Sequence, residues 1–236
     1  MMKRILIFIS LVLFVTTVMV PVFAQDAKQK KIKPLKLSKE EKKEGYMFLF
    51  DGTSLNKWDN PSGEYIVENG TIKKNNGGSG NLYTKENFDN FVLRFDFLLT
   101  PAANNGLGLR HNYTTGGYDG MELQIIDNED PSYKDLEPYQ YHGSLYGFVP
   151  AKRGYLKKPG EWNTQEVMVN GNHLTIKVND ELILDTNLAE ATKDAPATTR
   201  EKITRPSGRI AFLGHNDVVY FKNIRVKKLA PYLGIF

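Results

Sequence analysis

Alternation of apolar and polar residues is the feature that most restricts how this chain can fold. Every second residue from Phe91 to Leu99 is apolar, and the same pattern returns at residues 173–178. A period of two is typical of β-strands that bury one face and expose the other. Many strands of this kind can bury their apolar faces only if one sheet packs against another.

Residues that favour tight turns separate the apolar runs. Asn170 and Gly171 precede the second run, as in a β-hairpin, and Asn179 and Asp180 can reverse the chain again after it. The sequence therefore predicts an all-β fold, a two-sheet antiparallel β-sandwich of the jelly-roll type. Further strands are predicted at Met47–Phe50, Tyr65–Glu68, Leu107–Arg110, Met121–Ile126, Gly208–Leu213 and Val218–Val226, with a helical turn at Leu188–Ala191.

The first 24 residues have the composition of an export signal. Two cationic residues precede an apolar run from Ile5 to Val20, and small residues follow before Gln25. This order predicts a signal peptide at residues 1–24 that is removed on export, which would leave no membrane association. A retained membrane anchor is the alternative, because the apolar run approaches the roughly 20 residues that span a bilayer.

The remainder of the chain divides by composition. Residues 25–44 are rich in lysine but lack interleaved aromatic residues, so we predict a flexible basic leader and no nucleic-acid partner. From Gly45 onward the sequence alternates between apolar runs and glycine-rich turns, which predicts one domain at 45–230 and a tail at 231–236. There is no cysteine, so the apolar core alone must stabilise the domain.

Several polar residues lie within the predicted strands, where packing alone does not require them. Arg110, Glu122, Gln124 and Asp127 occupy strand-like sequence that is rich in glycine and tyrosine. Alternation places Glu122 and Gln124 on one face and Asp127 on the other, and a β-bulge would bring all three together. Alternation also directs His111 to the face opposite Arg110. A structural ion pair between Glu122 and Arg110 is the alternative to a functional site.

Six segments spread over nearly the whole predicted domain form a recognisable set: Phe48–Trp58, Ala103–Arg110, Met121–Asp127, Gly143–Gly147, Lys158–Asn163 and Phe221–Val226. In order, they resemble the motifs of the 3-keto-disaccharide hydrolase domain family. The resemblance implies a concanavalin A-like fold, export to the periplasm or surface of a bacterium, and cleavage of glycosides already oxidised at sugar carbon 3. It also implies an upstream oxidoreductase that forms the ketone.

A ketone at carbon 3 acidifies the hydrogen on carbon 2, so a base can remove that proton and the group on carbon 1 can then leave. Such a site needs a base, a donor or cation facing the enolate oxygen, and an acid near the leaving oxygen. The predicted catalytic residues are Glu122 or His142 as the base, Arg110 with Asn105 at the ketone, His215 or Tyr146 as the acid, and Asp127. The predicted substrate contacts are Asn105, Gln124, Tyr118, Tyr141 and Tyr146.

Other functions remain open at this point. A lectin-like, non-catalytic glycan-binding module would use the same polar and aromatic residues, whereas a carboxyl group with a raised pKa would favour an enzyme. A conventional β-glucan hydrolase is disfavoured, because Gln124 stands where the middle acid of a Glu-x-Asp-x-x-Glu strand would be. No cofactor is expected with certainty, although Glu122, Asp127 and loop carbonyls could hold a divalent cation.

Overall fold

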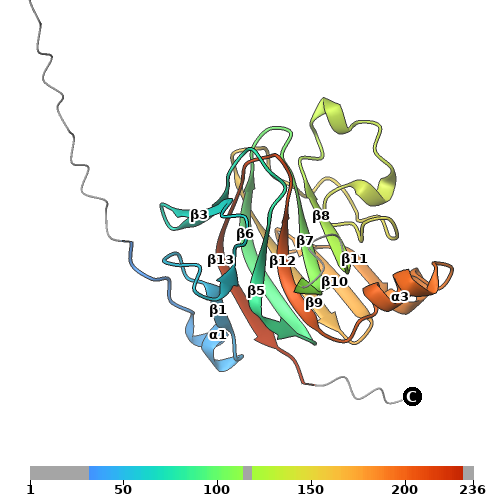
Figure 1. Cartoon of the computed structure of the whole chain (residues 1–236), viewed down its shortest axis with the longest axis horizontal. Helices are drawn as coiled ribbons and strands as arrows, with labels where there is room; N and C mark the ends of the chain where they lie inside the picture. The colour runs from blue at the N-terminus through green and yellow to red at the C-terminus, as the bar shows by residue number, and fades with distance from the viewer. Residues whose placement is uncertain (1–31, 114–118, 231–236) are drawn as a thin grey trace, which may run out of the picture. The chain divides into compact units, whose positions relative to one another are not determined.

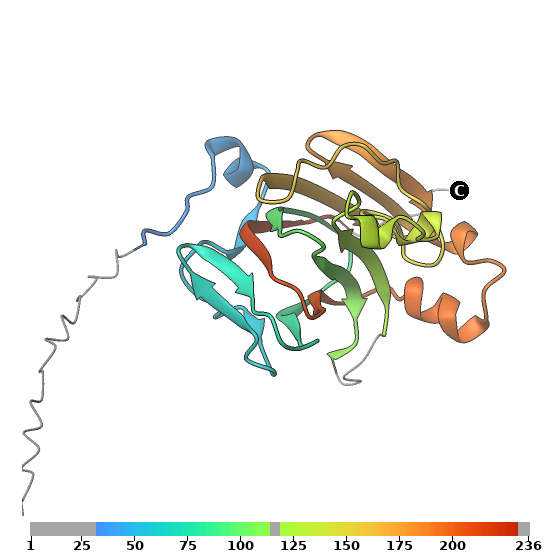
Figure 2. The same ribbon diagram turned by 90° about the horizontal axis from the view of Figure 1, so that it is seen from above.

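The computed structural model describes residues 32–113 and 119–230, which form two antiparallel sheets packed face to face (Figures 1 and 2). The larger sheet has the order β11-β10-β9-β6-β13-β4-β3, and β1 also pairs with β13. Its strands are β1 (Met47–Phe50), β3 (Tyr65–Glu68), β4 (Thr71–Lys74), β6 (Phe91–Leu99), β9 (Trp162–Asn170), β10 (His173–Val178), β11 (Glu181–Asn187) and β13 (Val219–Lys228).

The smaller sheet has five strands in the order β2-β5-β12-β7-β8. Its strands come from widely separated parts of the sequence. For example, β12 lies between β5 and β7 (Figure 1). The all-β, jelly-roll prediction is confirmed by this arrangement. The strands are β2 (Trp58–Asp59), β5 (Asn81–Phe88), β7 (Asn104–His111), β8 (Met121–Ile126) and β12 (Gly208–Gly214).

The apolar core fills the space between the sheets. Phe91, Phe95 and Phe97 of β6 are fully buried there, as the alternating pattern predicted. Phe212 of β12 stacks on Phe221 of β13 with ring centroids 3.8 Å apart. Because β12 and β13 belong to different sheets, this aromatic contact joins the two layers.

Short helices lie outside the sheets, and none in the described part of the chain is long and apolar enough to cross a membrane. Ser38 and Glu41 form a capping box at the first helix, and Glu41 also pairs with Arg225 of β13. Part of the predicted flexible leader is therefore helical and attached to the larger sheet. The helices are α1 (Lys39–Lys43), α2 (Leu188–Ala191), α3 (Ala197–Ile203) and the 3-10 turns η2 (Pro131–Tyr133) and η3 (Pro138–Gln140).

Strands β1, β3 and β8 have the predicted bounds, β7 and β12 extend beyond theirs, and β13 begins one residue later and ends two residues later than predicted. Strand β5 was not predicted, because Asn81, Lys85 and Glu86 interrupt its apolar pattern. The turn between β10 and β11 is as predicted, since Asn179 and Asp180 have φ values of 51° and 71°.

Replacing Phe212 by alanine tests the junction between the sheets. We expect the free energy of unfolding to fall by about 3–5 kcal/mol, because a buried aromatic ring that contacts both layers is removed. Leu182→Ala, at a position that is 40% exposed, should change it by no more than about 0.5 kcal/mol. Urea denaturation measures both values, and equally small losses would contradict the proposed role of Phe212.

Candidate active site

The outer face of the five-stranded sheet, which points away from the core, carries the polar residues of β8. Met121, Leu123 and Ile125 belong to the core between the sheets, so Glu122 and Gln124 point to the outer face. This confirms the predicted alternation of β8. The register between β7 and β8 is regular, so β8 has no bulge that would bring Asp127 to the same face.

Glu122 is a buried carboxyl group on this outer face, with only 9% of the residue exposed. Burial raises its pKa to about 7, because the charged form loses solvation and no cation compensates. The carboxylate lies over Gly106 of β7, where an added Cβ atom would be 2.1 Å from Oε1 of Glu122. A carboxyl group with this pKa can accept a proton near neutral pH.

His111 lies beside Glu122, on the face where Arg110 was predicted. An added Cβ atom at Gly108 or Gly120 would come within 2.8 Å or 2.7 Å of the imidazole, so the ring lies over both glycines. Gly108 is directly opposite Glu122 in the β7–β8 ladder, where paired residues have Cβ atoms about 5 Å apart. Burial lowers the pKa of His111 to about 4, with Asp119 opposing the shift, so the ring is neutral at pH 7.

A hollow of about 400 Å³ adjoins His111. Arg209 lies in its wall with its guanidinium 4.1 Å from the ring centroid of Tyr113, and it also pairs with Asp59 at 2.5 Å. Tyr113 meets Tyr83 edge to face, with ring centroids 5.2 Å apart. The outer face therefore combines a base, a neutral imidazole and an aromatic wall fixed by a cation.

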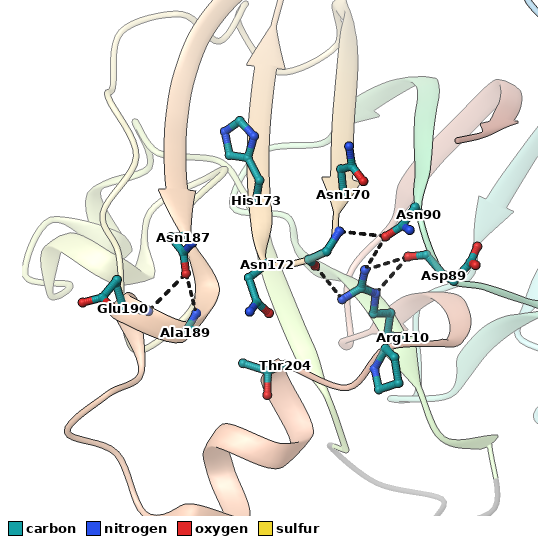
Figure 3. A pocket seen from close by; sticks show the side chains of 12 residues that line it. Asp89, Asn90, Arg110, Asn170, Asn172, His173, Asn187, Ala189, Glu190 and Thr204 are labelled. Carbon is teal, nitrogen blue, oxygen red and sulfur yellow. Dashed lines mark hydrogen bonds between the residues drawn. The ribbon is translucent and has the colours of Figure 1, made fainter. Parts of the chain in front are cut away.

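Arg110 does not lie with Glu122, so the structure does not bring it to the place where the prediction put the substrate ketone. The guanidinium points toward the end of the sandwich, where its five N–H groups all donate to protein oxygens (Figure 3). It forms part of a separate cleft of about 580 Å³. The ion pair between Arg110 and Glu122, the alternative to a functional site, is absent for the same reason.

His142 and Asn105 also lie on the wrong side of the sheet for the predicted roles. The imidazole of His142 stacks on Phe97 of the core at 5.0 Å, and burial lowers its pKa to about 3. Asn105 alternates inward with Leu107 and donates to the hydroxyl of Tyr65, which is fully buried. Neither residue can share a substrate with Glu122 across the sheet.

The remaining predicted residues hold turns and loops. The carboxylate of Asp127 accepts from the backbone N–H groups of Ala102 and Glu129, so it does not join Glu122 in the predicted cation site. Tyr141 donates to backbone carbonyls, and the hydroxyl of Tyr146 accepts from Gln140. The described residues contain no group of three or more acidic or histidine side chains arranged around a metal position.

His215 and Tyr118 are the two remaining predicted residues. His215 is an exposed residue just after β12, and partial loss of solvation around its ring lowers its pKa although Asp217 opposes the shift. Tyr118 falls outside the described residues. Among the predicted substrate contacts, the structure places Gln124 on the face of Glu122. His111, Tyr113 and Arg209 join them there without having been predicted, although Gly106, Gly108 and Gly120 signal the close approach of side chains to that face.

Comparison with known proteins identifies the family. Residues 45–227 match the model of the 3-keto-alpha-glucoside-1,2-lyase-like domain. The chain belongs to this family. A relative in Bacteroides thetaiotaomicron, named 3-keto-disaccharide hydrolase, is 28% identical over 79% of each chain. These matches confirm the resemblance drawn from the six sequence motifs and support a glycoside hydrolase family.

Solved structures confirm the fold. A Parabacteroides distasonis protein, named as a proposed glycosyl hydrolase, has a TM-score of 0.71 at 24% identity, covering 84% of this chain and 100% of its own. A carbohydrate-binding module from Bacillus subtilis has a TM-score of 0.50 at 10% identity, covering 73% of this chain and 96% of its own. At these identities the likeness concerns the fold alone.

Gly106→Ala tests the position of the Glu122 carboxylate. The added methyl group would overlap the end of a flexible side chain, so the carboxylate should swing toward solvent while the sheet stays in place. We expect the pKa of Glu122 to fall from about 7 toward 4.5. Carbon-13 NMR titration of the labelled carboxyl group measures it, with circular dichroism as a control for folding. An unchanged pKa would contradict the placement.

Glu122→Gln tests the energetic consequence of burial. Since the pKa of Glu122 in the folded protein exceeds its ordinary value of 4.5, the folded state binds the proton more tightly than the unfolded state. Wild-type stability should therefore fall as the pH rises from about 4.5 to 7. The variant should be more stable at pH 8 by about 2–3 kcal/mol, and equal at pH 4, in urea denaturation. A variant less stable at pH 8 would contradict the shift.

Proposed function

We propose that this protein cleaves 3-keto-glycosides, with Glu122 as the base that removes the proton from carbon 2. The observation that carries the proposal is the buried carboxyl group of Glu122, with a pKa of about 7, beside the neutral imidazole of His111. Membership of the family supports a substrate of this class. Removal of this proton needs one base, so no second carboxyl group is required beside Glu122.

The reaction proceeds through an enolate. Glu122 takes the proton from carbon 2, and the electron pair of that C–H bond forms the enolate with the carbonyl oxygen at carbon 3. The C1–O bond then breaks, its electron pair leaves with the aglycone oxygen, and that oxygen takes up a proton. Water adds across the resulting C1=C2 double bond, with oxygen on carbon 1 and hydrogen on carbon 2. Release before this addition is a lyase reaction, and release after it is hydrolysis.

The neighbouring side chains fit the remaining requirements. His111 is neutral at pH 7, so its ring can contact the sugar beside Glu122 without adding a positive charge to the site. The amide of Gln124 lies on the same face and suits a sugar hydroxyl. Tyr113 and Tyr83, held by Arg209, provide an aromatic wall against which the leaving sugar or aglycone can pack.

A non-catalytic glycan-binding role is the second candidate. It is favoured by the Tyr83–Tyr113 pair and by polar side chains suited to hydroxyl groups. The buried carboxyl group of Glu122 weighs against it, because burying a carboxylate without a partner destabilises the fold and a binding site gains nothing from it. A conventional retaining β-glucanase would need two carboxyl groups on one face, whereas Gln124 and Asp127 provide no second one beside Glu122.

The cellular setting is part of the proposal. The apolar segment within residues 1–24 supports export to the periplasm or the outside of the cell. Since a ketone at carbon 3 is not present in ordinary glycosides, an oxidoreductase must act before this protein. The proposed substrate is a small-molecule carbohydrate.

Release of a chromogenic aglycone tests the proposed function. The protein from Gln25 onward is incubated with a glucoside and with the same glucoside oxidised at carbon 3. We expect release from the oxidised compound alone, and at least about a 100-fold lower kcat for Glu122→Gln. Glu129→Gln, which alters an exposed carboxyl group, is the matched control and should retain wild-type activity.

The outcomes separate the two candidates. Equal release by Glu122→Gln and wild type would remove Glu122 from the role of base. No release from either glucoside, together with saturable binding of oligosaccharides in calorimetry, would favour the glycan-binding module. A parallel measurement with a chelator tests whether a divalent cation takes part.

A further inference from the structure

We propose that Arg110 is a positioning residue whose guanidinium holds a bulge in β7 and thereby turns His111 onto the outer face beside Glu122. The proposal deepens the proposed function, because it concerns the residue that assembles that site. It assigns Arg110 a role through His111 rather than through contact with a substrate. Three features of the structure support it: the register of β7, the hydrogen bonds of the guanidinium, and the fit of the His111 ring.

The register of β7 shows one extra residue at this point. Arg209 of β12 pairs with His111 and Ala211 pairs with Gly108, so β12 advances two residues while β7 advances three. Arg110 has φ +53°, in the left-handed region that arginine rarely adopts. In a bulge of this kind the side chains that follow change face. Arg110 therefore points inward, and His111 points outward.

The guanidinium compensates for this unfavourable backbone conformation. Nε and Nη2 donate to the carbonyl of Asp89, and Nη2 also donates to Oδ1 of Asn90. Nη1 donates to the carbonyls of Gly171 and Arg205 at 3.0 Å each, as Figure 3 shows for the contacts with Asp89, Asn90 and Gly171. Burial lowers the pKa of Arg110 to about 10, so the group stays charged at neutral pH.

These acceptors lie in three segments that connect the strands. Asp89 and Asn90 form the turn from β5 to β6, Gly171 lies in the turn from β9 to β10, and Arg205 precedes β12. Five hydrogen bonds from one side chain therefore fix the bulge relative to three separate segments. Uncharged residues of similar length cannot replace them, because they lack the five donors.

The backbone around the bulge is built to accept it. An added Cβ atom at Gly208 would lie 2.4 Å from the carbonyl carbon and oxygen of Arg110, so only glycine fits at that position. The carbonyl of Arg110 also accepts from Nη1 of Arg205, whose guanidinium pairs with Asp119. Hydrogen bonds of both the side chain and the main chain of Arg110 therefore stabilise the bulge.

The ring of His111 fits a place that two glycines leave open. Gly108 and Gly120 have no Cβ atoms beneath the imidazole, and any other residue would displace it. If the bulge were lost, alternation would return His111 to the inner face and the outer face would lose its imidazole. The guanidinium of Arg110 therefore controls a residue of the site without touching the substrate.

A double-mutant cycle of Arg110→Met and His111→Ala tests the proposal with a 3-keto-glucoside. We expect Arg110→Met to lower kcat by about 10- to 100-fold with little change in KM, because a misplaced group weakens the transition state more than substrate binding. In the His111→Ala protein the same change should lower kcat by less than about 2-fold, since Arg110 acts through that ring. Effects that multiply would overturn the proposal.

Histidine ring NMR provides a readout that does not depend on turnover. The His111 ring should titrate near pH 4 in the wild type and at a clearly different pH in Arg110→Met, because the ring leaves its place over Gly108 and Gly120. An unchanged titration would overturn the proposal even if the proposed function is correct, and a changed one would support it even if no 3-keto-glycoside is cleaved. The charged groups that face or adjoin the ring are Asp119, Arg205, Arg209, Lys85 and Glu122.

Controls separate positioning from a general loss of structure. Arg110→Lys keeps the charge and three donors, so it should recover part of kcat and of the His111 titration if hydrogen bonds to the carbonyls matter. Arg200→Met removes an exposed arginine of α3 and should change neither readout. Circular dichroism identifies a temperature at which every variant is folded. If Arg110→Met does not fold, Arg110→Lys is compared with wild type in both measurements, and unchanged values would overturn the proposal.

Discussion

The five hydrogen bonds of the Arg110 guanidinium are the interaction on which the rest of the site depends. They join the turn between β5 and β6, the β9–β10 hairpin and the chain before β12, and they stabilise a left-handed residue within a strand. A charge-assisted hydrogen bond to a backbone carbonyl is stronger than a neutral one, so the cluster can support a local conformation that the strand alone would not adopt. The same cluster closes one end of the sandwich.

The outer face of the smaller sheet shows how the fold creates reactivity. Gly106 and Gly108 have no side chains, so the space directly above the backbone of β7 is open to Glu122 and His111. Burial then raises the pKa of the carboxyl group and lowers that of the imidazole, so that both approach the protonation states that base catalysis needs. Burial of a carboxylate destabilises the folded protein, and such unfavourable burial is common at functional sites.

Much of the fold follows from the sequence, because burial on one face of a strand leaves a period of two that is visible in β6 and β10. The location of Glu122 and Gln124 follows from the same rule. The positions of Arg110 and His111 do not, because a single extra residue in β7 reverses both, and bulges depend on partners far away in the sequence. His142 lies in a turn beside Gly143, where functional residues are common, yet its ring stacks on Phe97 in the core.

Exchange of the hydrogen on carbon 2 tests the central claim most directly. A 3-keto sugar without a leaving group on carbon 1 can lose and regain that proton but cannot eliminate, so its signal in proton NMR reports the base alone. In heavy water the account predicts that wild-type protein replaces this hydrogen by deuterium and that Glu122→Gln does not. Equal exchange by the two proteins, or none with wild type, would contradict the account.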